Sequence, residues 1–187
     1  MTPPDMPVFG RVSLIDASAF DAGTAYVSTR LPPLDEFRPH VWSTEDYGET
    51  WTRIVDGIRD DAYLNSVRED PNREGLLYAG TNHGVYVTFD DGGWWRELNP
   101  GLPDMPVTDV IPQHDELAMA SHGRGFRVLD NVGPLRRWEP GSGGVPGTAE
   151  RAWCCSSLRW RTGQGAGWCC RGGWGRVLEV RRRRSWR

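Results

Sequence analysis

The hydrophobic and polar positions of this chain form short runs that are typical of β-strands separated by tight turns. Within residues 76–98 one apolar run ends at Gly80, and a second run of β-branched and aromatic residues covers 85–89. The turns at 82–84 and 90–93 contain Asn, Asp and Gly, which tolerate the positive φ angles of hairpins. Further strands are predicted at 12–17, 24–29, 40–43, 51–54, 63–68, 107–111, 116–120, 125–129 and 135–138.

The turn at 90–93 has a counterpart upstream. Residues 44–51 (TEDYGETW) match residues 88–95 (TFDDGGWW), with Thr, Asp, Gly and Trp at the same offsets. A repeat with this period of 44 residues and four strands is typical of a β-propeller blade. We therefore divide the chain into three blades, at residues 11–58, 62–99 and 107–139.

The pattern (Ser/Thr)-x-Asp-x-Gly-x-x-Trp resembles the Asp-box, or bacterial neuraminidase repeat, of sortilin-like and glycosyl-hydrolase-like propeller proteins. The resemblance covers residues 9–137. It implies that the chain is a C-terminal propeller fragment and that the box is a folding device rather than a catalytic motif. The residues that carry it are Thr44, Asp46, Gly48, Trp51, Thr88, Asp90, Gly92 and Trp95.

Three blades fall short of a closed ring, because propellers typically close with about four to eight blades. The two end blades would then have open edges with unpaired backbone groups and uncovered apolar faces. We expect an all-β partial propeller whose partners are the remaining blades of a longer protein or another chain.

The net charge of −3 conceals two segments of opposite sign. Residues 1–140 hold 12 arginines against 23 acidic residues, a net charge of −11, whereas residues 141–187 hold 10 arginines against 2 glutamates, a net charge of +8. The second segment shows no strand or helix periodicity. We expect a lead-in at 1–10, the propeller at 11–140, and a linker with a disordered Arg/Trp/Cys-rich tail at 141–187, whose composition a shifted reading frame would explain.

The tail carries little interpretable chemistry. Its cysteine pairs, 154–155 and 169–170, lack the spacing of a zinc site, so we expect no metal and no cofactor. Its arginines and tryptophans could bind polyanions by charge and stacking, but we expect no specific nucleic-acid partner. No signal peptide is visible, no apolar run is long enough to cross a membrane, and the sequence leaves the localisation unknown.

Two classes of function remain. One is a non-catalytic scaffold or binding module for a peptide, protein or glycan, in which His122 and Arg124 are the candidate binding residues on a glycine-containing turn. In the plainer alternative for this turn, the glycines make the hairpin and His122 bonds the backbone.

The other class is a fragment of a sialidase-like glycoside hydrolase whose catalytic residues lie largely outside this chain. Glycosidases need two carboxylates that converge across a pocket, and the sequence identifies no such pair. The Asp-box interpretation makes Asp46 and Asp90 structural, so we assign no catalytic residue.

Overall fold

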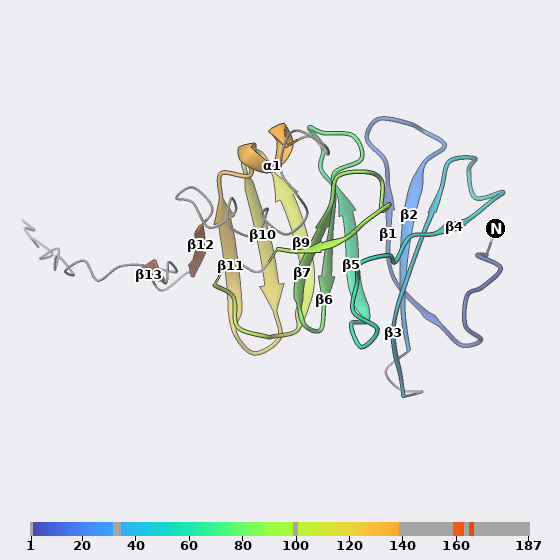
Figure 1. Cartoon of the computed structure of the whole chain (residues 1–187), viewed down its shortest axis with the longest axis horizontal. Coiled ribbons are helices and arrows are strands. Elements are labelled where there is room, and N and C mark those ends of the chain that lie inside the picture. Colours follow the sequence, from blue (N-terminus) through green and yellow to red (C-terminus); the bar gives the residue numbers. More distant parts are fainter. Residues whose placement is uncertain (1, 32–34, 99–100, 139–158, 163–164, 167–187) are drawn as a thin grey trace, which may run out of the picture.

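The computed structural model describes residues 2–31, 35–98, 101–138, 159–162 and 165–166. Three antiparallel sheets stand side by side in chain order (Figure 1). The first comprises β1 (Arg11–Ala17), β2 (Ala25–Leu31), β3 (Glu36–Thr44) and β4 (Thr52–Arg53). The second comprises β5 (Leu64–Glu69), β6 (Leu77–Thr81), β7 (Gly84–Thr88) and β8 (Arg96–Glu97). The third comprises β9 (Val107–Gln113), β10 (Glu116–Ser121), β11 (Gly125–Asp130), β12 (Arg159–Thr162) and β13 (Gly165–Ala166).

The helix α1 (Gly133–Arg137) occupies a segment that the sequence predicts as a strand, so the strand predicted at 135–138 is wrong. Pro134 lies in the first helical turn, where its missing N–H costs no hydrogen bond. The amides of Leu135 and Arg136 both donate to the Val132 carbonyl. Leu135 buries its side chain in the core.

The fourth strand of the third sheet comes instead from the region where we expected no regular structure. β12 pairs with β11 through the register Leu129↔Trp160, and Trp160 is buried within the core. The signal in the sequence is the alternation Arg-Trp-Arg-Thr followed by Gly, which the high arginine content obscured. β13 adds a further short strand from the same region, so the prediction of a wholly disordered tail is wrong at 159–162 and 165–166. The rest of the predicted tail lies outside the described residues.

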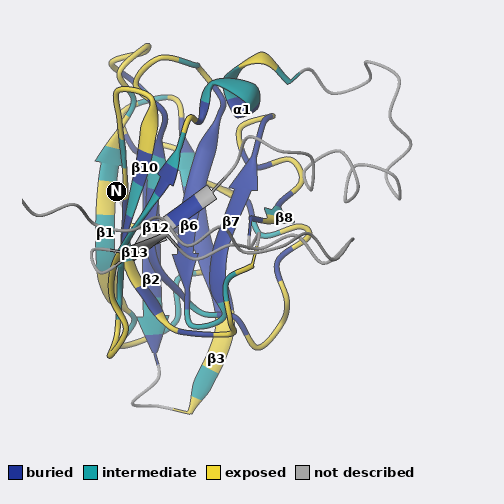
Figure 2. Cartoon of the chain, turned by 90° about the vertical axis from the view of Figure 1, so that its left-hand side faces the viewer, coloured by how far each residue is buried: buried dark blue, intermediate teal, exposed yellow. Residues whose placement is uncertain are grey.

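The core consists of two layers of side chains, one at each junction between sheets. Tyr26, Val41 and Ile54 of the first sheet pack against the second sheet, including Tyr86 and Trp95. The opposite side of the second sheet packs against the third sheet, so β6 and β7 are buried throughout (Figure 2). Continuous burial explains why these two strands are apolar runs rather than alternating ones.

The first strands of the three sheets contact one another, β1 with β5 and β5 with β9. Arg68 on β5 bridges Asp16 on β1, at 3.5 Å, and Asp109 on β9, at 3.2 Å. One guanidinium therefore links all three sheets on the side where their first strands meet.

A second polar link joins α1 to the second sheet. The Arg136 Nε donates to both carboxylate oxygens of Asp70, each at 3.0 Å, and the Tyr78 hydroxyl donates to Asp70 at 3.2 Å. The Asp70 side chain is fully buried, so its oxygens depend on protein donors for their hydrogen bonds.

We predict that Arg136→Gln lowers the free energy of unfolding by about 3 kcal/mol, because it leaves the Asp70 carboxylate buried without its counter-charge. Urea denaturation measures the loss. The matched control is Arg137→Gln on the same helix, where the side chain is exposed and the change should be close to neutral. Equal stability of the two variants would contradict this assignment.

Candidate functional site

The two repeated turns share a local geometry. In the β3–β4 turn, Tyr47 and Gly48 have φ angles of 59° and 84°, and in the β7–β8 turn, Asp91 and Gly92 have φ angles of 54° and 91°. Two successive left-handed residues reverse the chain tightly, and only the second of each pair is glycine. A side chain must therefore be held in an unfavourable backbone conformation by its surroundings.

Hydrogen bonds to the aspartate of each turn provide that restraint. The Thr44 hydroxyl donates to Asp46 at 2.8 Å, and the Thr50 amide and hydroxyl donate to the same carboxylate at 2.8 Å and 2.6 Å. In the second turn, the Thr88 hydroxyl and the Trp94 amide donate to Asp90 at 2.6 Å and 3.1 Å.

These bonds set the electrostatics of Asp46. Hydrogen bonds from the Thr50 side chain and amide lower the pKa of Asp46 to about 2. The carboxylate stays ionised at all physiological pH values and serves as an acceptor within its own turn, so it is unsuited to donating a proton.

The second turn also contacts the first sheet. Trp95 is buried, and its indole N–H donates to the Ile54 carbonyl at 2.9 Å while its amide donates to the Asp56 carbonyl at 2.8 Å. A Cβ at Gly92 would lie 2.7 Å from the Ile54 side chain, so this contact requires glycine. The neighbouring Trp94 is 56% exposed.

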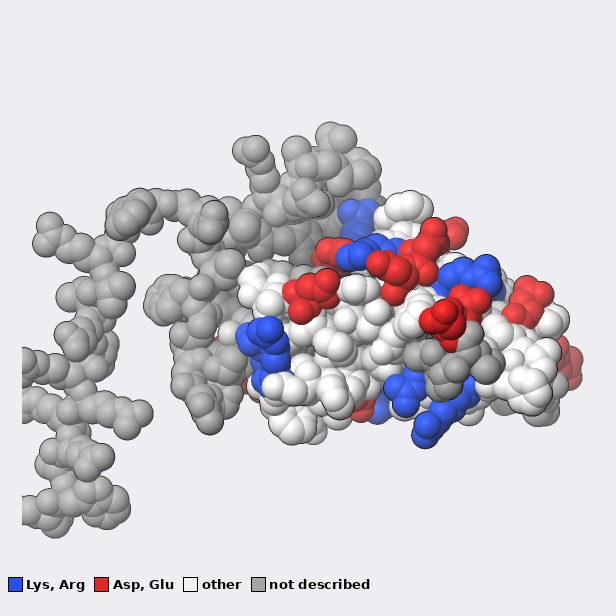
Figure 3. All heavy atoms as spheres, turned by 90° about the horizontal axis from the view of Figure 1, so that it is seen from below, with Lys and Arg blue, Asp and Glu red and all other residues white. Residues whose placement is uncertain are grey.

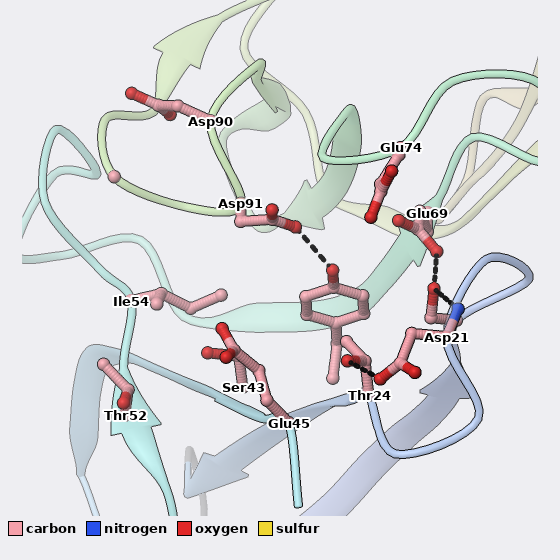
Figure 4. Close-up of a pocket in the computed structure, with 13 residues that line it drawn as sticks. Asp21, Thr24, Ser43, Glu45, Thr52, Ile54, Glu69, Glu74, Asp90 and Asp91 are labelled. Atoms are coloured by element: carbon pink, nitrogen blue, oxygen red, sulfur yellow. Dashed lines mark hydrogen bonds between the residues drawn. The ribbon is translucent and has the colours of Figure 1, made fainter.

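A pocket of about 540 Å³ lies where the second turn meets the first sheet (Figure 4). All of its walls come from the end of the sheets that carries the β1–β2, β3–β4, β5–β6 and β7–β8 turns. Carboxylates and hydroxyl groups dominate the lining. It consists of Ser18, Asp21, Thr24, Tyr26, Ser43, Glu45, Thr52, Ile54, Glu69, Glu74, Asp90, Asp91 and Gly93.

Several of these carboxylates are bonded to neighbouring hydroxyl groups. The Tyr26 hydroxyl donates to Asp91 at 2.6 Å, and the Thr24 hydroxyl donates to Asp21 at 2.8 Å. In Figure 4 Asp91 points toward Tyr26, whereas Asp90 points away from the other acidic groups. Burial and the hydrogen bond to Asp91 raise the pKa of Tyr26, so its hydroxyl remains a donor.

Glu69 differs from the other acidic residues of the pocket because it is buried. Burial raises its pKa, although the Ser18 hydroxyl donates to it at 2.6 Å and the amides of Gly75 and Ala19 donate to it at 3.3 Å each. Nearby Asp91 raises the pKa of Glu69 further. A raised pKa favours the protonated form of a carboxyl group, which is the form that a general acid uses.

His122 and Arg124 lie in the β10–β11 turn, at the opposite end of the sheets from this pocket. Both residues are exposed, and the His122 amide donates to the Pro106 carbonyl at 2.9 Å. Acidic and basic side chains are interspersed over that end (Figure 3). The structure therefore does not bring these two residues together with the pocket.

Most of the pocket was not predicted from the sequence. Its residues Asp21, Glu45, Glu69 and Glu74 come from three hairpins, and only the arrangement of the sheets brings them near the β7–β8 turn. One feature of the sequence pointed to an acidic pocket. The second repeat has two adjacent aspartates, Asp90 and Asp91, whereas the first repeat has Tyr47 at the position of Asp91.

Within the described ranges no group of three or more His, Cys, Asp or Glu side chains has the arrangement of a metal site. No helix in that part of the chain is long and apolar enough to cross a bilayer.

No known protein-family profile matches the sequence, and no curated protein matches it. Solved structures do. A GH74 enzyme from Niastella koreensis aligns with a TM-score of 0.50 and 13% identity over 64% of this chain and 21% of its own length. An ancestral GH74 enzyme aligns with a TM-score of 0.53 and 14% identity over 69% of this chain and 18% of its own. YCF48 bound to D1 peptide aligns with a TM-score of 0.45 and 20% identity over 71% of this chain and 38% of its own.

The GH74 structures are β-propellers, and at these identities the likeness concerns the fold alone. It confirms the expected all-β, partial β-propeller architecture of about three blades. The chain spans about a fifth of the length of these GH74 enzymes.

We predict that Asp90→Ala lowers the free energy of unfolding by about 1.5–3 kcal/mol, because it removes a charged acceptor from the Thr88 hydroxyl and the Trp94 amide. Urea denaturation is the measurement. Glu49→Ala, which removes an exposed carboxylate from the other turn, is the control and should be nearly neutral. If the two variants unfold at the same urea concentration, Asp90 is not a structural acceptor.

The stability that Asp46 contributes should depend on pH. Its folded pKa lies below the ordinary value of 3.8, so the contribution is present above 3.8 and is lost as the pH falls through about 2. Melting temperatures of the wild type and Asp46→Asn should differ at neutral pH and converge near pH 2. A difference of constant size would show that the Asp46 charge is not linked to folding.

Proposed function

We propose that this chain is a non-catalytic scaffold and binding module, part of a larger sortilin-like Asp-box repeat protein. The proposal rests on one observation, which is that the residues of the repeated motif have structural roles. Asp46 and Asp90 accept hydrogen bonds within their own turns, and Trp95 joins its sheet to the preceding one. The motif thus builds the propeller, and its partners are further blades of the ring or another chain.

The ligand site of this module is the pocket between the first two sheets. Six carboxylates and five hydroxyl groups line it, and no basic residue is among the described residues that do so. The field of such a lining favours cations and repels anions. A peptide carrying Arg or Lys side chains fits this chemistry best, a neutral glycan fits through the hydroxyl groups, and an anionic sugar such as a sialic acid is disfavoured.

One observation favours the alternative, a fragment of a glycoside hydrolase. Glu69 combines burial, a raised pKa and a position in the pocket beside Asp91, which are features of an acid catalyst with a second carboxylate nearby. Against this role, the Glu69 oxygens accept three hydrogen bonds from Ser18, Ala19 and Gly75. These bonds hold Glu69 in place between two hairpins and leave it little freedom to protonate a leaving group.

We predict that a tetra-arginine peptide binds the chain and that Glu45→Gln with Glu74→Gln weakens binding about tenfold, because both exposed carboxylates line the pocket. Calorimetric titration at low salt measures the affinity. The control pair, Glu49→Gln with Asp104→Asn, removes two charges outside the pocket and should change the affinity much less.

A separate experiment tests the enzyme alternative. It measures the turnover of fluorogenic glycosides, both neutral ones and one that carries sialic acid. Binding without turnover supports the module. Turnover that Glu69→Gln abolishes would overturn the non-catalytic proposal, and equal affinity of both double variants for the peptide would overturn the pocket as its site.

A further inference from the structure

The side of the first sheet that faces away from the second sheet contains buried polar atoms without partners. Among the described residues, the Trp51 and Trp42 indole N–H groups, both His40 ring nitrogens and the Thr29 hydroxyl have no hydrogen bond. The register Thr29↔His40 and Val27↔Trp42 places these strand residues on one face, and the stacked rings of His40 and Trp42 have centroids 5.8 Å apart. Buried polar groups in folded proteins are nearly always paired, so this face lacks partners that the fold calls for.

The repeat identifies the missing partner of Trp51. Trp51 is the counterpart of Trp95, 44 residues earlier. Trp95 donates its indole N–H to the Ile54 carbonyl, directly after the fourth strand of the preceding sheet. Trp51 presents the same donor from the same position of the first sheet, and it has no preceding sheet to receive it.

The N-terminal segment covers this side without substituting for a sheet. It runs beyond the first sheet, on the side away from the second (Figure 1), and Pro3 within it is buried. The amides of Met6 and Gly10 bond within the segment itself, to Pro3 and Pro7. The indole N–H groups of Trp42 and Trp51 have no acceptor among the described residues.

We propose that this face, defined by Thr29, His40, Trp42 and Trp51, is the docking surface for a further four-stranded sheet of the same repeat. The incoming sheet takes the position that the first sheet has relative to the second. Residues 2–10 must leave this face for it to dock, because Thr29, His40 and Trp42 are only 0%, 5% and 1% exposed in the present chain. It supplies a main-chain carbonyl, directly after its fourth strand, to the Trp51 indole. The Tyr26–Asp91 bond has no counterpart here, because Tyr47 stands in the position of Asp91.

This inference rests on the proposal that the chain is part of an Asp-box propeller, and a tandem chain tests it. A second copy of residues 11–63 is placed directly before Arg11, in place of residues 2–10. The native linker 54–63 then joins the added sheet to the first sheet as it joins the first to the second. The added Ile54 carbonyl is thereby offered to Trp51 of the original copy.

Trp51→Phe in the original copy should lower the melting temperature of the tandem chain by about 2–4 °C more than it does in the natural chain, because it removes one hydrogen bond. Trp95→Phe, whose indole is bonded in both chains, is the control and should lower both melting temperatures alike. An equal effect of Trp51→Phe in the two chains would overturn the proposal.

Light scattering on the natural chain completes the test. If it is a dimer that Trp51→Phe dissociates, a second copy occupies the face and the proposed occupant is wrong; a monomer agrees with the proposal. The tetra-arginine titration on the same proteins separates this inference from the proposed function. If the tandem chain binds the peptide but Trp51→Phe has the same effect in both chains, the proposed docking surface is wrong and the proposed pocket still stands.

Discussion

The contact between the β7–β8 turn and the first sheet is the constraint on which the rest of this structure depends. Trp95 fixes the turn with two hydrogen bonds to carbonyls of the preceding segment, and Asp91 accepts a third from Tyr26. Gly92 allows the backbone to approach Ile54 more closely than any side chain would permit. A turn that is rigid within itself thus becomes the joint between two sheets, and the pocket is the space left beside that joint.

The strands and turns could be predicted from the sequence because their causes are local. Alternating apolar positions and the Asp-Gly turns specify hairpins without reference to distant residues. α1 was not predicted because its conformation depends on distant partners. Leu135 packs in the core, and Arg136 bonds to Asp70. Trp160 escaped prediction because the reading of 141–187 gave more weight to charge composition than to a four-residue alternation.

The pocket could not be predicted because it depends on contacts between residues that are distant in the sequence. Its carboxylates come from four separate stretches of the sequence, at residues 21, 45, 69–74 and 90–91, and only the stacking of sheets assembles them. His122 and Arg124, which were predicted as binding residues from their residue types, lie at the other end of the sheets and stay a prediction. Residue type indicates what a side chain can do, whereas the topology decides which side chains act together.

The most direct measurement is a double-mutant cycle between Tyr26→Phe and Asp91→Ala, with stability measured by urea denaturation. Tyr26 and Asp91 meet at 2.6 Å across the joint that the β7–β8 turn makes between the first two sheets. We expect a coupling energy of at least about 1 kcal/mol, as for a hydrogen bond to a charged group. Strictly additive effects of the two substitutions would mean that the turn does not hold the sheets together, and would contradict the account.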